Sequence, residues 1–259
     1  MKSIKIIPTL LGCILIFLIG CTKKDPIIPA GWGDLSNVRI AAVFGSTGER
    51  FIKTNYENAN FRGYDSTIDA IVDLKLGKVD YLITSYVNAT NYIKQNPDLI
   101  IKPGYVESEG VAIAVRKDDS KLLADLSKLI QKFKEDGTLV DVVKRWVRES
   151  NVPYEPKEIP VHEGGKVLRV GISADMEPMI FMAYDKVIGL DAELIERIAY
   201  ELKMVVEYHN VPFDALIALL DSDLVDVVIS NLTSTEERRL LVNFTEDYYS
   251  NPLVLMEKK

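Results

Sequence analysis

The chain has 259 residues, of which 47% are hydrophobic, and its 31 basic and 38 acidic side chains give a net charge of −7. An acidic chain without a basic run is a poor candidate for a nucleic-acid-binding protein, because the phosphate backbone attracts clustered Lys and Arg. The histidines His162 and His209 are far apart, and the sequence contains no Cys/His cluster, so we expect no zinc site and no cofactor.

The first twenty residues have the pattern of a signal peptide. Lys2 and Lys5 give a positive start, and the apolar run 6–19 is too short for a membrane-spanning helix, which needs about 20 residues. The run ends at Leu18 to Cys21 (LIGC), which resembles the lipobox of bacterial lipoproteins. We therefore expect lipidation of Cys21 with palmitate. The alternative is an ordinary signal peptide that happens to contain a cysteine.

Removal of this leader would leave one cysteine and a more acidic protein. Cys13 lies inside the removed segment, and lipid would occupy the sulfur of Cys21, so we expect no disulfide even in an oxidising compartment. Loss of Lys2 and Lys5 lowers the basic count from 31 to 29 against 38 acidic residues, a net charge of −9. About 230 residues remain, enough to bury one or two substantial cores.

Segments that contain proline and glycine divide the chain into blocks. The order of these blocks predicts an α/β protein with two lobes. We expect a signal peptide at 1–20, a lipid-anchored tether at 21–35 and a linker with three prolines at 151–164. The remaining boundaries are 36–116 for an α/β domain with a hinge strand, 117–150 for helices that pack on the other lobe, and 165–259 for an α/β domain that ends in a hinge strand.

In the first block, strands and helices alternate, which predicts a parallel sheet covered by helices. Val38 to Val43 is a buried-strand run, and a helix is expected from Glu49. The sequence Asp65-Ser66-Thr67 should cap a helix whose apolar residues lie on one face, namely Ile68, Ile71, Val72 and Leu76. Further strands are expected at 79–84, 99–101 and 111–116, and further helices up to Gln95, at 121–135 and at 139–147.

The second block repeats the scheme, and the two blocks resemble each other locally. Segments 79–85 and 225–231 both follow a short helix and end in small polar residues. Open α/β sheets bind ligands at the carboxyl ends of strands, so these ends could face a shared cleft, although any helix-to-strand unit has this pattern. Strands are expected at 167–172, 205–209, 225–229 and 253–256, and helices at 191–202, at 213–220 and from Thr235.

The sequence from Val167 onward resembles the opening of a known family. The stretches that carry the resemblance are Leu168 to Asp175 with Pro178, Gly189 to Leu194, Phe213 to Ile217, Ser230 to Arg238, and Asn243 to Tyr249. In this order they are similar to the first half of the type II periplasmic amino-acid-binding proteins, the bacterial extracellular solute-binding family 3. The resemblance implies a two-lobed fold that closes on a small solute.

The earlier block resembles the second half of the same family. The matching stretches are Asp34 to Ile40, Gly45 to Thr47, Val79-Asp80, Gly110 to Lys117 and Asp136 to Trp146. Because the second half comes first, the chain looks like a circular permutation that is cut after the family's first crossover and rejoined through 151–165. This order implies that Lys259 ends close to Asp34.

The resemblance also implies a site for the carboxylate of a ligand. It assigns the carboxylate to Arg238, Thr233, Asn231 and Ser230, because guanidinium groups and unpaired helical N–H groups favour anions. Arg238 could instead be a solvated surface arginine. The remaining candidates are Thr47 and Gly48, which would complete the anion site, Phe213, which would stack on the ligand, and Ser85, Ser173 and Met176; Gly48 could be only a turn residue and Phe213 only a core residue.

Two positions depart from the family pattern. Where members that bind α-amino acids commonly carry an acid for the ligand ammonium, this chain has Ser85. Met176 occupies the position of a second aromatic wall, and methionine adapts to varied ligands. The resemblance therefore implies contacts for a ligand carboxylate and leaves open whether the ligand carries an amine.

Together these features predict a monomeric, envelope-localised binding protein for a small anionic or zwitterionic solute, attached to the membrane by lipid only. It would close about a hinge at Val111 to Lys117 and pass its solute to a transporter permease or report it to a sensor. One alternative is a dehydratase-like periplasmic enzyme, with Glu177 as the nearest candidate acid. Another is a degenerate module that mediates contacts between proteins.

Overall fold

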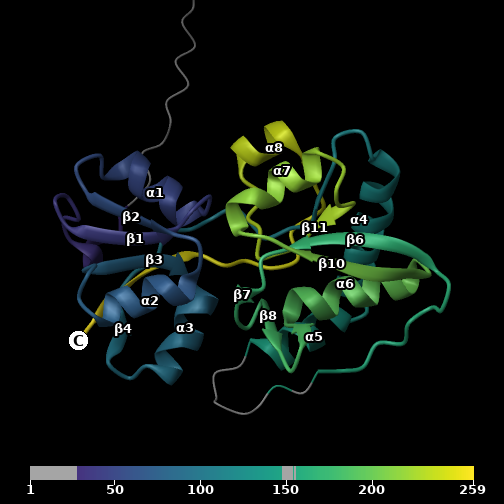
Figure 1. The fold of residues 1–259 in the computed structure, drawn as a ribbon, viewed down its shortest axis with the longest axis horizontal. Helices are drawn as coiled ribbons and strands as arrows, with labels where there is room; N and C mark the ends of the chain where they lie inside the picture. Colours follow the sequence, from purple (N-terminus) through teal and green to yellow (C-terminus); the bar gives the residue numbers. More distant parts are fainter. Residues whose placement is uncertain (1–27, 148–153, 155) are drawn as a thin grey trace, which may run out of the picture.

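The computed structural model describes residues 28–147, 154 and 156–259. The expected signal peptide, Cys21 and part of the linker lie outside the described residues. The described chain forms two α/β lobes, coloured purple to blue and teal to yellow in Figure 1, and the C-terminal strand returns to the first lobe. No helix among the described residues is long and apolar enough to cross a membrane.

The first lobe is built on a five-stranded sheet whose central strands are buried on both faces. Apolar residues alternate between two cores: Val254 and Met256 pack beneath two helices, while Leu253 and Leu255 pack against the other face. Continuous apolar runs of this kind are typical of sheets that helices cover on both sides. The strand order is β2 (Asn60–Tyr64), β1 (Arg39–Val43), β3 (Tyr81–Ser85), β13 (Leu253–Lys258) and β4 (Leu99–Ile101), with β13 antiparallel to both neighbours.

Three helices cover this sheet, and side-chain caps fix where two of them begin. Ser46 caps α1 (Thr47–Asn55), and Ser66 caps α2 (Thr67–Lys75), each by accepting the backbone N–H three residues ahead. The third helix, α3 (Tyr86–Gln95), has Ser85 as its N-cap residue. The side chain of Ser85 makes no capping hydrogen bond. A 3-10 turn, η1 (Ala30–Trp32), closes the lobe by packing Trp32 against Phe51 of α1.

The second lobe contains another five-stranded sheet and a small antiparallel sheet. The main strand order is β10 (Met204–Asn210), β6 (Lys166–Ile172), β11 (Val227–Val228), β5 (Ala114–Val115) and β12 (Asn243–Phe244). The small sheet contains β7 (Asp175–Met176), β8 (Ile180–Ala183) and β9 (Lys186–Ile188). The helical elements are α4 (Ser120–Glu135), α5 (Thr138–Trp146), α6 (Leu190–Glu201), η2 (Phe213–Ala215), α7 (Leu216–Asp221) and α8 (Glu236–Leu241).

Helices α4 and α5 pack on the second lobe, in one core with residues of β6 and α6. A buried carboxylate fastens α5 there: Glu193 of α6 is 3% exposed and accepts hydrogen bonds from Arg145 (2.6 Å), Trp146 (2.8 Å) and Arg197 (2.9 Å). A buried charge is tolerated when it is paired and hydrogen-bonded in this way. The helices that precede the linker thus belong structurally to the block that follows it.

Two antiparallel segments connect the lobes. The first leaves β4 and leads to β5, and the second leaves β12 and leads to β13. They pair through Val106 and Leu253, which exchange two backbone hydrogen bonds of 2.9 Å, and through Val111 with Tyr249. Of the expected hinge at Val111 to Lys117, residues 111–115 are fully buried in the second lobe. The C-terminal strand β13, expected as a hinge strand, is an inner strand of the first sheet.

The apolar face expected on α2 is divided in the structure. Ile71 is buried against the sheet, whereas Ile68, Val72 and Leu76 are 53%, 48% and 64% exposed. The buried stripe instead follows Ala70, Ile71 and Leu74. The sequence pattern identified the helix but not its inward face, because apolar residues occupy more than one face.

Candidate functional site

A cavity lies between the lobes at the carboxyl ends of β1 and β3. It has about 50 Å³ of water-accessible space. Both lobes and the returning segment before β13 contribute to its walls. The lining residues are Val43, Ser46, Thr47, Gly48, Thr67, Ile83, Thr84, Ser85, Asn88, Met176, Phe213, Asn231, Thr233, Arg238, Asn251 and Leu253.

The N-terminus of α1 forms one wall. Ser46 Oγ accepts the N–H of Glu49 (3.2 Å), and the Glu49 carboxylate reaches back to the N–H of Gly45 (2.6 Å), as in a capping box. The first-turn N–H groups of Thr47 and Gly48 have no intrahelical acceptor and are available to an anion. Gly48 must lack a side chain, because a Cβ there would lie 2.9 Å from the carbonyl oxygen of Ile83. It is therefore a packing requirement of the cavity and not only a turn residue.

Arg238 of α8 lies opposite this helix end. Its Nη1 donates to the carbonyl of Thr233 (2.8 Å), and its Nη2 donates across the cleft to the carbonyl of Gly45 (2.7 Å). The guanidinium lies over the ring of Phe213, with Cζ 5.4 Å from the centroid, so a cation–π contact holds its plane. Burial, and next the charge of Arg50, lower the pKa of Arg238 to about 10, so the group remains charged at neutral pH.

A line of amides connects the lobes on the far side of the cavity. Asn231 Nδ2 donates to Ser85 Oγ (3.3 Å), and Asn231 Oδ1 accepts from Asn251 Nδ2 (3.0 Å). Asn251 Oδ1 in turn accepts the N–H of Val87 (3.1 Å), and the carbonyl of Pro252 accepts that of Tyr86 (2.8 Å). The segment before β13 therefore caps α3 in place of a local side chain and leaves Ser85 to face the cavity.

The buried carboxyl group of Asp191 holds the backbone of Asn231 in place. Asn231 has a left-handed conformation (φ 48°), and its N–H donates to Asp191 Oδ2 at 2.6 Å. Tyr248 donates its hydroxyl to the other carboxylate oxygen at 2.7 Å. Burial raises the pKa of Asp191 to about 7 in spite of these two hydrogen bonds, which oppose the shift.

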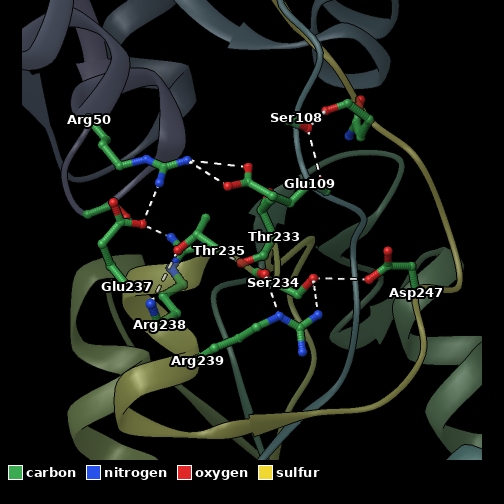
Figure 2. Close-up of polar contacts among 12 residues, drawn as sticks. Arg50, Ser108, Glu109, Thr233, Ser234, Thr235, Glu237, Arg238, Arg239 and Asp247 are labelled. Carbon is green, nitrogen blue, oxygen red and sulfur yellow. Dashed lines mark hydrogen bonds and ion pairs between the residues drawn. The ribbon is translucent and has the colours of Figure 1, made fainter. Parts of the chain in front are cut away.

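Ion pairs join the lobes outside the cavity. Figure 2 shows Arg50 of α1 between Glu237 of α8 and Glu109 of the crossing segment. These side chains are exposed, so each pair contributes only about 0–1 kcal/mol. The neighbouring Arg239 points away from the cavity and donates to Ser234. Ser234 also donates to Asp247 at 3.0 Å (Figure 2).

The structure brings eight of the ten ligand-site candidates to the cavity wall. Ser173 and Ser230 are the exceptions: both are buried, and Ser230 Oγ accepts the N–H of Ser173 at 2.9 Å beneath the cavity. Glu177, the acid of the enzyme alternative, lines an outer groove between α2 and β8 instead. The eight lining candidates are Thr47, Gly48, Ser85, Met176, Phe213, Asn231, Thr233 and Arg238.

Sequence reasoning missed five polar residues of the wall, one of which is Thr84 at the end of β3. Ser46 and Thr67 belong to helix starts that the sequence signalled, and their capping patterns could have placed them near the cleft. Asn88 lies in the first turn of α3, and Asn251 precedes the last strand. No local pattern marks those two, because their role depends on β13 lying beside β3.

Residues 168–259 match the model of the bacterial extracellular solute-binding proteins, family 3. The arginine-binding extracellular protein ArtP of Bacillus subtilis is 35% identical over 96 residues, 37% of this chain and 38% of that protein. The ABC transporter arginine-binding protein 1 of Escherichia coli is 30% identical over 130 residues, 48% of this chain and 52% of that protein. The chain therefore aligns with about two fifths to one half of these relatives.

Among solved structures, the arginine-bound form of domain 1 from TmArgBP has 31% sequence identity and a TM-score of 0.31. The match covers 36% of this chain and 80% of that one. The two relatives from Bacillus subtilis and Escherichia coli are named as binding proteins rather than enzymes.

The raised pKa of Asp191 gives a testable pH dependence. Between about pH 4 and 7 the folded protein holds a proton that the unfolded chain has released, so this group makes stability fall as pH rises. In Asp191→Asn this pH dependence of the free energy of unfolding should disappear. The slope that is lost is up to about 1.4 kcal/mol per pH unit. Urea unfolding from pH 4 to 8 measures it. Tyr248→Phe removes a hydrogen bond but keeps the acid, so it should keep the slope; equal slopes in wild type and Asp191→Asn would contradict the assignment.

Proposed function

From the match of residues 168–259 to the bacterial extracellular solute-binding proteins, family 3, we propose that the chain belongs to this family and binds a small carboxylate-bearing or amino-acid-like solute between its lobes. The observation that carries the proposal is the position of Arg238. Its charged guanidinium faces the free N–H groups of Thr47 and Gly48 across the cavity. A carboxylate placed between them would receive hydrogen bonds from both lobes and so favour the closed arrangement.

We infer that the solute is delivered to a transporter permease or sensed at the cell envelope. The names of two relatives place arginine-binding proteins outside the cell and in an ABC transporter. A lipid anchor on Cys21 would keep the protein near such a membrane partner, and the LIGC sequence at the end of the apolar run supports this anchor. A monomer suffices, because the two lobes of one chain surround the cavity.

We also infer that the two halves of the family fold occur in permuted order. In support, the matched segment is the C-terminal one, and its last strand, β13, inserts into the sheet of the preceding block. Tyr81 of β3 pairs with Ile40 of β1 on one side and with Glu257 of β13 on the other. The start of β1 and the end of β13 thus lie at the same end of the sheet. They are about 10 Å apart, because only β3 lies between these two strands.

Substitution of Arg238 tests the binding function. Arg238→Ala should weaken binding by about 2–5 kcal/mol, because it removes one partner of a largely desolvated charge pair. A thermal-shift screen of free amino acids and small carboxylic acids would first identify a stabilising solute, and calorimetry would then compare the variants. Arg239→Ala is the matched control, because its side chain lies outside the cavity, and it should bind nearly as the wild type does. Equal affinity in Arg238→Ala would remove this residue from the site.

Substitution of Cys21 tests the lipid anchor. Cys21→Ala should move the protein from the membrane fraction to the soluble fraction, or leave the leader uncleaved, because no thiol would accept the lipid. Cys13→Ala is the control, and the protein should remain membrane-bound. Fractionation with immunoblotting provides the measurement. Normal cleavage together with membrane association of Cys21→Ala would count against lipidation.

A rearranged chain tests the permutation. Joining Lys259 to Ile28 by a flexible linker and opening the chain within 151–165 should give a folded protein with similar solute affinity, because every strand keeps its neighbours and Trp32 stays in the core. Circular dichroism and calorimetry provide the comparison. A control opened within α6 instead should not fold, because that helix lies in the core of the second lobe. Failure of the 151–165 opening to fold would overturn the permuted order.

A further inference from the structure

The cavity presents one charge to a ligand. Among the described residues that line it, Arg238 is cationic, and the others are apolar, hydroxyl-bearing, amide-bearing or glycine. Three carboxylates close to the wall are hydrogen-bonded to protein groups: Glu49 accepts from Gly45, Asp175 accepts from Thr67 (3.4 Å) and Ser173 (3.2 Å), and Asp191 accepts from Asn231 (2.6 Å) and Tyr248 (2.7 Å). None of the three is among the residues that line the cavity. A solute inside the cavity would therefore meet positive charge without a compensating carboxylate.

The cavity also contains an unused hydrogen-bond acceptor. Asn88 of α3 is 2% exposed, lines the cavity, and has no hydrogen-bond partner for its Oδ1 within the described chain. A buried carbonyl without a partner is uncommon in a folded protein, and it suggests a missing donor. Because the amide is neutral, a hydroxyl can donate to it and leave no charge unpaired.

The size of the cavity limits the carbon skeleton. One buried water needs roughly 10–15 Å³ of water-accessible space, so the 50 Å³ in the present lobe arrangement holds only a few waters or a short ligand. Arg238 spends two of its N–H groups on the carbonyls of Thr233 and Gly45. A guanidinium has five N–H donors, so others remain for a carboxylate.

From these contacts we propose, resting on the proposed solute-binding function, that the preferred ligands are short hydroxycarboxylic acids rather than the α-amino acids of the same skeleton. The carboxylate is held by Arg238 and the N-terminus of α1. The hydroxyl donates to Asn88 Oδ1 on the wall that contains Ser85. An ammonium in the position of the hydroxyl would be buried without a carboxylate partner, which is unfavourable for a charged group.

Isosteric pairs test this directly, because each pair differs only in a hydroxyl or an ammonium. The full-length processed protein in detergent would be titrated by calorimetry with lactate and alanine, malate and aspartate, and 2-hydroxyglutarate and glutamate. At least one hydroxy acid should bind tenfold or more tightly than its amino acid. Amino acids that bind as tightly as their partners in all pairs, or tighter, would overturn the proposal and leave the solute-binding function standing.

Two variants locate the preference within the cavity. Ser85→Asp supplies the carboxylate that the wall lacks, so it should shift the pair ratio toward the amino acid by tenfold or more. Asn88→Leu should remove the advantage of lactate over propionate, which lacks the hydroxyl. Asn91→Leu is the matched control: Asn91 is buried on the same helix, lies outside the cavity wall, and its loss should leave both ratios unchanged.

The remaining outcomes separate this proposal from the solute-binding function. Unchanged ratios in both Ser85→Asp and Asn88→Leu would overturn the placement of the hydroxyl. If none of the six compounds binds, but another solute binds in a manner that Arg238→Ala abolishes, the ligand class is wrong and the function stands. If no compound in the wider screen binds, both fall.

Discussion

The structure depends on one strand at the end of the chain. β13 lies between β3 and β4, and its residues 253–256 are buried on both faces of the first lobe's sheet. Until it is in place, β3 lacks one neighbour and β4 has none, because these pairings supply their ladder hydrogen bonds. The first lobe therefore cannot be completed until the second lobe has been synthesised, although it comes first in sequence.

The same strand organises the cavity. The segment that leads into β13 provides Asn251 and Pro252, which satisfy the first N–H groups of α3. Asn251 also holds Asn231 of the second lobe, whose backbone Asp191 fixes from below. A side chain at the C-terminal end of the sequence thus connects a helix start in one lobe to a loop in the other. Local structure, packing and site geometry are determined together by this crossing.

How well the sequence predicted each part of the structure depends on whether the signal for that part is local in the chain. The helices with capping residues and the strands with long apolar runs, such as 166–172 and 253–258, lie within a few residues of their expected bounds. β2 was missed because it is an edge strand with few buried residues. The burial of residues 111–115 in the second lobe could not be predicted, because the apolar run after Gly110 has the same pattern whether it crosses between lobes or lies inside one. Ser173 and Ser230 were assigned to the site from the resemblance alone, and only coordinates show that they hydrogen-bond to each other beneath it. Asn88 gave no signal, because its environment is created by residues from three distant segments.

Which ligand favours closure of the lobes depends on the acceptors that compete for the guanidinium of Arg238. With the lobes together, its guanidinium already donates to a carbonyl from each lobe, so the closed arrangement has polar contacts of its own across the cleft. A ligand shifts the lobes toward closure only by as much as it favours the closed over the open state. A neutral ligand that displaces the Gly45 carbonyl exchanges one neutral acceptor for another and gains little. A carboxylate exchanges it for a charged acceptor, which adds the attraction between opposite charges to the hydrogen bond. A ligand that uses the remaining N–H groups of Arg238 adds its hydrogen bonds to this contact, and a carboxylate again gains more than a neutral acceptor because the donor is charged. In both cases closure of the lobes favours an anion.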